Sequence, residues 1–497
     1  MFKLGFDNQR YIQMQSENIL KRIEMFKEKL YLEFGGKLFD DFHATRVLPG
    51  FEPDSKLKML LRLKDVCEMM IVINANHIDQ NKMRGDLGIT YDQDLMRLID
   101  AFKLVGLDVG SVVITHFSGQ RKAMILRKKL EENDIRVAYH YYIDNYPTDI
   151  ENICSSNGFG KNEHIITKKP LVVVTAPGPG SGKLAVCLSQ MYHDYNIGIN
   201  AGYAKFETFP IWNLSLDHPI NVAYEAATLD LDDQNMIDYF HKKAYGIETI
   251  NYNRDLESFP ILNVLLEKIM GYSVYQSPTD MGVNMVGYCI IDDDICRQAA
   301  CQEIIRRYYD CLLGLRLDYV NQKQVDKILK IINKLNIDVN SRKSVGACLK
   351  KAELSKTVAC AIELEDGTIV TGKNTSLLGS ASAAILNALK NLAGIDDDIT
   401  LISPDLIIPI QDLKTLKLGG NNPRLHVDEV LIILAISALN NQFAKKAYAA
   451  LPLLKGGQMH SSVILSGVDV NTIKKLGISL TMSPIYNTKK LYHKKSK

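Results

Sequence analysis

The clearest signal in the chain is an alternation of short apolar runs with longer segments of helical periodicity. Segments 92–105 and 121–133 carry apolar residues at helical spacing and separate the first three runs. The runs are rich in Val and Ile, which is typical of strands buried in a parallel sheet, and they cover residues 69–74, 111–115, 137–143 and 171–175. This alternation predicts an α/β fold: a parallel, Rossmann-like sheet with helices on its faces.

Helical periodicity also precedes these runs. Residues 16–32 place Ile19, Leu20, Ile23 and Phe26 on one side of a helix. Ser16 is a suitable N-cap residue, and the glycine pair at 35–36 would end the segment. We therefore expect one amphipathic helix over residues 16–32.

Polar side chains follow the predicted strands at the points where a parallel sheet binds ligands. Asn74, Asn76 and His77 come after the first run, and His116 and Ser118 after the second. The topology predicts that these side chains converge on the turn after the fourth run. Each histidine taken alone is more commonly a buried or solvent-facing side chain than a catalytic group.

The fourth run leads directly into a glycine-dense turn that ends in lysine, Ala-Pro-Gly-Pro-Gly-Ser-Gly-Lys at 176–183. A helix-compatible segment follows, so backbone N–H groups and the helix N-terminus can hold a phosphate there. We expect a nucleotide or another phosphorylated molecule to bind this P-loop-like turn through Gly178, Gly180, Ser181, Gly182 and Lys183.

The turn departs from the G-x-x-x-x-G-K-[ST] pattern at two positions. Pro177 occupies the place of the first glycine, and Leu184 occupies the place of the hydroxyl residue that normally binds magnesium. Ser181 and Thr175 are the nearest alternative oxygens. A tight strand-to-helix turn without a ligand is the other interpretation of the same residues.

Lys205 and Glu207 form a second candidate pair. They lie two residues apart in an extended segment, so they share one face. Together with Lys183 they are the predicted catalytic residues, suited to orienting a substrate or neutralising a phosphate. A surface ion pair worth roughly 0–1 kcal/mol is the alternative. Acidic residues downstream could assist through a magnesium ion, or could simply carry helix-end charge: Glu225, Asp230, Asp232 and Asp233.

Two further segments carry candidate ligands. Arg46 precedes a turn built on Pro49 and could meet a phosphate or a carboxylate, although a surface loop explains the segment equally well. Asp280 and Asn284 lie one helical turn apart if a helix begins at Pro278. The start of such a helix is also an anion-binding geometry.

The pattern divides the chain into a Rossmann-like domain over 1–230, a mainly helical region over 231–335 and a C-terminal α/β domain over 345–497. The last domain opens with a hairpin, 357–364 and 368–372, and an alanine-rich helix through 381–392. This order resembles the start of a cytidine-deaminase-type domain. The positions of its H-x-E motif read Ser-Ala-Ser-Ala-Ala at 380–384, and no P-C-x-x-C follows. The resemblance implies a relative without zinc ligands, kept for packing, assembly or ligand binding.

Composition narrows the class of protein. The 497 residues carry a formal charge of +2, so nothing favours nucleic acid as a partner, and only the run 489–497 is strongly basic. The N-terminus does not have the pattern of a signal peptide, and the longest apolar run, 430–439, is too short to span a bilayer. Nine scattered cysteines without a C-x-x-C pair suggest neither a disulfide framework nor a structural zinc site. We expect a cytoplasmic protein that contacts no membrane.

Four motifs together resemble a bacterial family known as a domain of unknown function: the segments at 43–51, 176–183, 202–213 and 277–284. The likeness covers the whole chain and implies a large N-terminal part with a smaller, deaminase-like C-terminal domain. Some members have been labelled ATP-dependent zinc proteases, but this chain contains no H-E-x-x-H motif. The resemblance implies no particular reaction.

These observations lead to two hypotheses. In the first, the protein is an enzyme that binds a nucleotide, with magnesium as an accompanying ion, or another phosphorylated metabolite at residues 178–183. It would transfer a phosphoryl group or drive a ligation with ATP, as a transferase or ligase rather than a zinc protease or zinc deaminase. In the second, the protein is a non-catalytic metabolite-binding or assembly protein. A homo-oligomer is possible. Leu184 favours the second.

Overall fold

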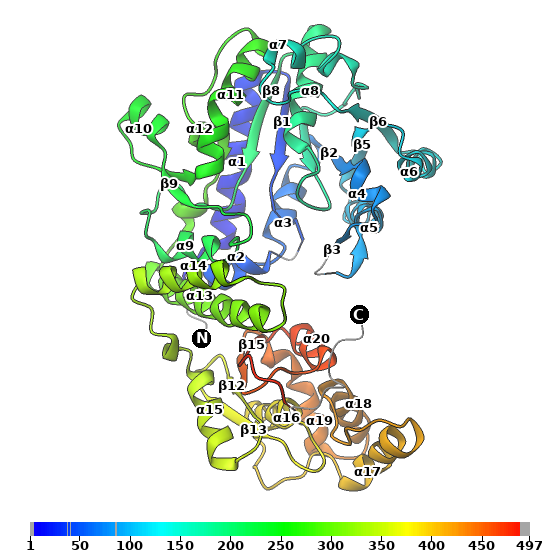
Figure 1. Cartoon of the computed structure of the whole chain (residues 1–497), viewed down its shortest axis with the longest axis vertical. Helices are drawn as coiled ribbons and strands as arrows, with labels where there is room; N and C mark the ends of the chain where they lie inside the picture. The colour runs from blue at the N-terminus through cyan, green and yellow to red at the C-terminus, as the bar shows by residue number, and fades with distance from the viewer. Residues whose placement is uncertain (1–3, 37, 40, 85–86, 488–497) are drawn as a thin grey trace. The chain divides into compact units, whose positions relative to one another are not determined.

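The computed structural model describes residues 4–36, 38–39, 41–84 and 87–487, so the basic run at 489–497 lies outside the described residues. The chain divides into two compact units, Lys3–Ala300 and Cys301–Lys497. We call them the N-terminal unit and the C-terminal unit and describe each by itself (Figure 1).

A parallel sheet forms the centre of the N-terminal unit. Within the described residues it has seven strands in the order β11-β8-β1-β7-β2-β5-β6, and every neighbouring pair is parallel. The strands are β1 (Lys29–Phe34), β2 (Cys67–Asn74), β5 (Asp108–Phe117), β6 (Arg136–Tyr141), β7 (Leu171–Thr175), β8 (Ala201–Phe206) and β11 (Gly282–Val283). The four predicted runs overlap β2, β5, β6 and β7. The predicted α/β fold with a parallel sheet is confirmed.

Helices and two short antiparallel strand pairs complete this unit. The pairs are β3 (Met83–Arg84) with β4 (Ile89–Thr90), and β9 (Asn235–Ile237) with β10 (Ile250–Tyr252). The helices are α1 (Asn8–Phe26), α2 (Phe42–Val47), α3 (Ser55–Arg62), α4 (Ala75–Asp79), α5 (Tyr91–Leu104), α6 (Arg121–Glu131), α7 (Ile150–Ile153), α8 (Lys183–Asn196), α9 (Pro219–Glu225), α10 (Tyr239–Tyr245), α11 (Asn253–Met270) and α12 (Pro278–Met281).

The single helix expected over residues 16–32 is wrong at both ends, because α1 begins at Asn8 with Asp7 rather than Ser16 as its N-cap and ends at Phe26. Lys27 adopts a left-handed conformation (φ 69°) and ends α1. β1 follows at once and pairs with β7 on one side and β8 on the other. Strand pairing on both edges satisfies the backbone of β1, which explains why tertiary context overrides the helical spacing here.

Alternation along β1 separates the two faces of the sheet. Lys29 Nζ lies 3.2 Å from Asp194 Oδ2, and Tyr31 donates to the same carboxylate over 2.7 Å, so odd-numbered residues face α8. α1 covers the opposite face (Figure 1), where a Cβ on Gly202 would lie 2.1 Å from the Phe26 ring. The absence of a side chain at residue 202 lets α1 approach β8 closely.

The C-terminal unit is built on a four-stranded sheet, within the described residues, of order β13-β12-β14-β15. β12 is antiparallel to both neighbours, and β14 and β15 are parallel. The strands are β12 (Ala359–Glu363), β13 (Ile369–Lys373), β14 (Gln458–Ser461) and β15 (Ser479–Met482). The helices are α14 (Gln322–Lys334), α15 (Lys343–Ser355), α16 (Ser380–Leu392), α17 (Pro404–Asp412), α18 (Val427–Ser437), α19 (Gln442–Ala449) and α20 (Gly467–Lys475).

The boundary between the units falls inside α13 (Asp293–Arg316). The sequence placed its last boundary later, in the connection after residue 335. The segment 231–335 also contains β9, β10 and β11 besides its helices. No helix in the described part of the chain has the length and apolarity needed to cross a membrane.

Candidate functional site

The order of the strands marks where a ligand of the parallel sheet is expected. β7 continues through α8 to β8 in one direction along the sheet, whereas β2 continues through α5 to β5 in the other. β7 and β2 are hydrogen-bonded neighbours, so their outgoing loops part at this point. Ligands of open parallel sheets bind in the crevice that such a reversal creates. The loop after β7 is the glycine-dense turn.

The backbone of this turn has the geometry of an anion site. Gly180 (φ 72°) and Gly182 (φ 88°) are left-handed, a conformation that favours glycine. Gly182 is the N-cap residue of α8, which starts at Lys183, has no acidic residue in its first turn and receives no side-chain cap from the described residues. The positive end of the α8 dipole is therefore not neutralised by a described side chain of its own cap or first turn.

Side chains at the ends of β2 and β5 anchor the turn through its carbonyl groups. Asn74 Nδ2 donates to Gly180 O over 3.1 Å, and Thr115 Oγ1 donates to Ser181 O over 2.6 Å. Asn74 Nδ2 also lies 3.3 Å from His116 Nδ1. These contacts bring Asn74 and His116 to the turn and fix the orientation of its peptide units.

Ser181 supplies a hydroxyl inside the turn. Its side chain is 3% exposed, and its Oγ has no hydrogen-bond partner among the described residues. A serine hydroxyl both donates and accepts, so it suits a phosphate oxygen. Leu184, in the first turn of α8, has no oxygen to offer a metal ion.

The two histidines near the turn differ in their contacts. A Cβ on Gly180 would lie 3.6 Å from His77 Cε1, so His77 borders the turn. Burial lowers the pKa of His77, assisted by the Lys82 charge, and burial lowers the pKa of His116 as well. His116 is also left-handed (φ 53°). Asn76 is bound elsewhere, because its Oδ1 accepts from Gln120 Nε2 over 2.8 Å.

Lys183 connects the turn to the end of β1. Its Nζ lies 3.9 Å from Glu33 Oε1, and Tyr203 donates to the other oxygen of Glu33 over 2.8 Å. Glu33 is also the register partner of Lys205 across β1 and β8, so both side chains lie on the α8 face. The sequence does not point to Glu33, because helical spacing predicts the end of a helix rather than a strand just before this residue.

Lys205 lies between two carboxylates. Its Nζ is 2.8 Å from Glu207 Oε1 and 2.6 Å from Asp255 Oδ2, and Asp255 belongs to the first turn of α11. Burial raises the pKa of Glu207 to about 7 against the opposing Lys205 charge, with help from the Asp255 charge. Although burial lowers the pKa of Lys205, the charges of Asp255 and Glu207 raise it above its ordinary value.

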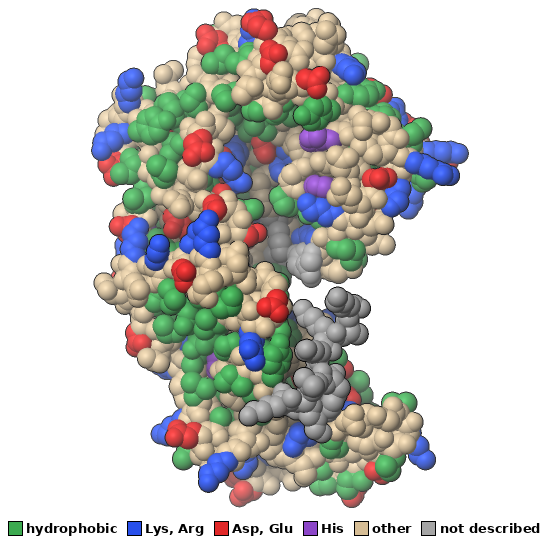
Figure 2. Space-filling view, in the orientation of Figure 1, with side chains coloured by type: hydrophobic (Ala, Val, Ile, Leu, Met, Phe, Trp, Pro, Cys, Tyr) green, Lys and Arg blue, Asp and Glu red, His purple; other side chains and the backbone are tan. Residues whose placement is uncertain are grey.

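We call Glu33, Lys183, Lys205, Glu207 and Asp255 the strand-end charge cluster. Its members come from the ends of β1 and β8 and the beginnings of α8 and α11. Figure 2 shows the surface of the N-terminal unit hollowed between the part that carries α9, α10 and α12 and the part that carries α4 and α5, with cationic side chains and His at its walls. The three predicted catalytic residues therefore belong to one group of charges.

Asp280 and Asn284 are not one helical turn apart, because α12 ends at Met281. Asp280 accepts from Tyr245 OH over 3.0 Å and lies 3.5 Å from His241 Nδ1. Asn284 is 2% exposed and donates to the carbonyl of Pro210 over 2.9 Å. The expected helix does begin at Pro278, but its two candidate ligands have separate protein partners.

The remaining candidates lie apart from the cluster or have protein partners. Arg46 is in the last turn of α2, a helix that contacts α9. Glu225 accepts from Asn235 N over 2.6 Å, and Asp233 lies 3.3 Å from Arg254. Among the residues that the structure describes, no three His, Cys, Asp or Glu side chains are grouped so as to hold a metal ion.

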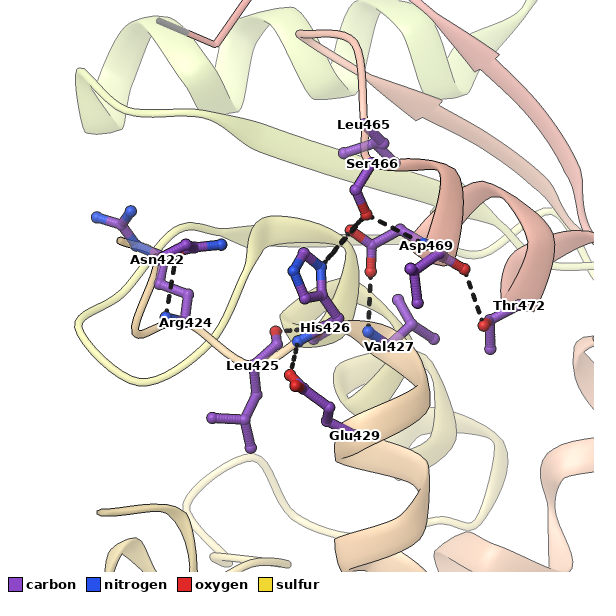
Figure 3. A network of polar contacts seen from close by, with 12 residues as sticks. Asn422, Arg424, Leu425, His426, Val427, Glu429, Leu465, Ser466, Asp469 and Thr472 are labelled. Carbon is purple, nitrogen blue, oxygen red and sulfur yellow. Dashed lines mark hydrogen bonds and ion pairs between the residues drawn. The ribbon is translucent and has the colours of Figure 1, made fainter. Parts of the chain in front are cut away.

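The C-terminal unit carries a polar network of its own (Figure 3). Asp469 Oδ2 lies 2.9 Å from His426 Nδ1 and accepts from Ser466 Oγ over 2.8 Å, while its other oxygen accepts from Val427 N over 2.9 Å. The Asp469 hydrogen bond raises the pKa of His426 above its ordinary value against burial. This network ties the start of α18 to the start of α20.

Fold and site together define an α/β protein with a glycine-dense turn at the reversal point of a parallel sheet. Comparison with known proteins identifies its family. Residues 4–336 match the N-terminal domain of unknown function DUF1846, and residues 340–492 match its C-terminal domain. The chain belongs to this family, as its motifs suggested.

Relatives of similar length occur in streptococci. A UPF0371 protein of Streptococcus thermophilus is 55% identical over 494 residues, which cover 99% of this chain and all of the relative. UPF0371 proteins of Streptococcus sanguinis and Streptococcus pneumoniae are each 53% identical over the same coverage.

Proposed function

We propose that the protein binds a phosphorylated metabolite, a nucleotide included, at the β7–α8 turn. The observation that supports this most directly is the start of α8. It has two left-handed glycines before it, no described side-chain cap and no acid in its first turn, and it lies at the reversal point of the sheet. Backbone N–H groups in this arrangement point toward a bound anion and favour negative charge.

Two side chains would complete the phosphate site. Ser181 offers a buried hydroxyl without a partner among the described residues. Lys183 is only loosely paired, since 3.9 Å separates its Nζ from Glu33. A phosphate dianion would compete well for this ammonium, because charge-assisted hydrogen bonds to phosphate are short and strong. Because Leu184 lacks a hydroxyl, we propose that no protein-held ion occupies the usual magnesium position.

The strand-end charge cluster supplies the chemistry in this proposal. Burial raises the pKa of the Glu207 carboxyl group toward neutrality, and a carboxyl group in that range can both give and take a proton at neutral pH. Lys205 would hold the Glu207 side chain in place and stabilise negative charge that develops near the phosphate. We infer a phosphoryl-transfer or ligation reaction, in which positioning and charge stabilisation dominate catalysis.

We further propose that the C-terminal unit is a deaminase-like domain without zinc ligands. The strand order β13-β12-β14-β15, the antiparallel β12 and the helix α16 directly after the hairpin support this topology. The positions that would carry the zinc-binding motif read Ser-Ala-Ser-Ala-Ala at 380–384. Without zinc ligands the C-terminal unit would serve in assembly or ligand binding.

Thermal-shift measurements on the full chain test the phosphate site. Inorganic phosphate, ATP, GTP and sugar phosphates are each added with and without magnesium, and a ligand at a hundred times its Kd stabilises the folded state by about 2.7 kcal/mol. Lys183→Ala should weaken binding roughly 10- to 100-fold, because it removes a charge-assisted hydrogen bond worth about 1.5–3 kcal/mol.

Lys103→Ala is the matched control, since Lys103 is an exposed lysine on α5. It should bind every ligand as the wild type does. The proposal fails if no phosphate compound stabilises the wild type. Binding without release of phosphate or formation of a new product would support the non-catalytic alternative.

A further inference from the structure

β9 and β10 form an antiparallel pair connected through α10, which we call the β9–β10 hairpin. It contains two buried polar side chains without hydrogen-bond partners in the described part of the chain. Asn235 is 7% exposed, and neither its Oδ1 nor its Nδ2 is bonded. Tyr252 is 5% exposed, and its hydroxyl is likewise unbonded. The two residues are register partners, so their side chains leave the hairpin at the same point.

This pair lies next to the strand-end charge cluster. Tyr252 is the N-cap residue of α11, and Asp255 in the first turn of that helix is 2.6 Å from Lys205 Nζ. Glu207 and Asp255 are among the charges that act on the Tyr252 hydroxyl, whose pKa is raised chiefly by burial. The hairpin therefore extends the cluster with neutral hydrogen-bonding groups.

Buried polar groups without partners are costly, at about 1–3 kcal/mol each. A folded protein usually pairs such groups with protein atoms or ordered water, and a ligand that carries hydroxyl groups can supply the partners that these two neighbouring side chains lack. An asparagine amide offers two donors and one acceptor, and a phenol offers one donor and an acceptor. Neighbouring hydroxyl groups on a ligand match both.

The spacing of the strands indicates how long the ligand must be. β8 is two strands from β7 in the sheet, with β1 between them. Neighbouring strands are about 4.8 Å apart, so the end of β8 is about 10 Å from the phosphate-type turn. A ligand that reaches from the turn past Lys205 to the hairpin must carry more than a phosphate group.

We propose that the ligand of the β7–α8 turn is a phosphate ester of a sugar, and that Asn235 and Tyr252 bind its hydroxyl groups. The proposal rests on the proposed phosphate site and names the rest of the molecule bound there. Lys205 and Glu207 then lie between the phosphate and the distal hydroxyls, where they act on the sugar.

Isothermal titration calorimetry on the full chain tests this with inorganic phosphate, glucose 6-phosphate, ribose 5-phosphate and AMP as probes. The wild type should bind at least one sugar ester about tenfold or more tightly than inorganic phosphate. Tyr252→Phe and Asn235→Leu should each weaken that ester by roughly two- to tenfold, the effect of one lost neutral hydrogen bond. Neither should change the affinity for inorganic phosphate.

The same variants report on structure. Since the removed groups have no described partner, the ligand-free melting temperature should not fall for Tyr252→Phe. Tyr239→Phe, which removes the hydroxyl group of an exposed tyrosine on α10, is the control and should bind every probe as the wild type does. A preference for glucose 6-phosphate would identify a hexose ligand, and a preference for ribose 5-phosphate or AMP would identify a ribose ligand.

Two outcomes overturn the proposal separately. If inorganic phosphate and all the esters fail to bind, the phosphate site itself is wrong, and the sugar assignment falls with it. If inorganic phosphate binds but the esters gain nothing, or both hairpin variants bind the esters as the wild type does, only the sugar assignment is wrong.

Discussion

Burial and ion pairing compete at Lys205 and Glu207, and the outcome differs between the two residues. Lys205 has two carboxylate partners within 2.8 Å, which is enough to keep its ammonium charged in a half-buried position. Glu207 has only that one shared lysine, and its side chain is 11% exposed. Desolvation wins, so the pKa of Glu207 rises to about 7.

The raised pKa of Glu207 predicts a pH dependence of stability. Between pH 4.5 and about 7 the folded state keeps a proton on Glu207 that the unfolded chain releases. The free energy of unfolding therefore falls as pH rises through this range. Glu207→Gln cannot lose this proton, so its free energy of unfolding does not fall for this reason. The difference in free energy of unfolding, variant minus wild type, should therefore increase by roughly 1–3 kcal/mol from pH 5 to pH 8.

Thermal denaturation of both proteins at half-unit pH intervals measures this difference. Glu257→Gln, at an exposed position of α11, serves as the control and should follow the wild type at every pH. A constant offset between Glu207→Gln and the wild type across the range would show that Glu207 titrates normally.

Single residues also show how far the sequence predicts the site. Lys205 and Glu207 could be paired from their spacing, because residues two apart on a strand share a face. Asp255 could not be added to this pair from the sequence. It lies 48 residues after Glu207, and no periodic pattern shows that α11 starts beside β8. The sequence predicts Asn284 as a ligand but does not show its protein partners, because the three hydrogen bonds of its side chain include two to the distant carbonyls of Thr208 and Pro210.

Among elements, the sequence predicts best where strands are buried on both faces. β2 and β7 are buried at every position, so their apolar runs are unmistakable. β1 carries Lys29 and Glu33, whose charges are satisfied by Asp194, Lys183 and Tyr203. Those partners are far away in the sequence, and without them the segment has the pattern of a helix end.

The packing of α1 on β8 predicts a strong effect of a single methyl group. In Gly202→Ala the new Cβ would lie 2.1 Å from the Phe26 ring, so this ring, or α1 with it, must move away from the sheet. We expect the free energy of unfolding to fall by roughly 1–3 kcal/mol, as for other overpacked cores. Denaturant titration of the full chain measures the change.

Gly346→Ala is the matched control for this substitution. Gly346 lies inside α15, and nothing is within 4 Å of its added Cβ. Alanine should therefore stabilise the helix by about 1 kcal/mol. Equal effects at both glycines would show that the α1–β8 contact is looser than described.

On the scale of the whole molecule, the family boundary and the folding boundary differ. The two family domains meet between residues 336 and 340, whereas the compact units divide at Ala300. Residues 301–336 contain most of α13 and all of α14. In the C-terminal unit the ring of Tyr309 on α13 is 5.0 Å from that of His460, which is 0% exposed.

A fragment that starts at the family boundary should therefore fold worse than one that includes α13. Residues 340–497 would lose the cover of Tyr309 over the buried His460, and α13 and α14 would be missing altogether. Residues 293–497 keep α13 whole. We expect the longer fragment to unfold cooperatively in a thermal scan followed by circular dichroism, and the shorter one to show no cooperative transition or to aggregate. If both fragments melt cooperatively at the same temperature, α13 does not belong to the folding unit of the C-terminal sheet.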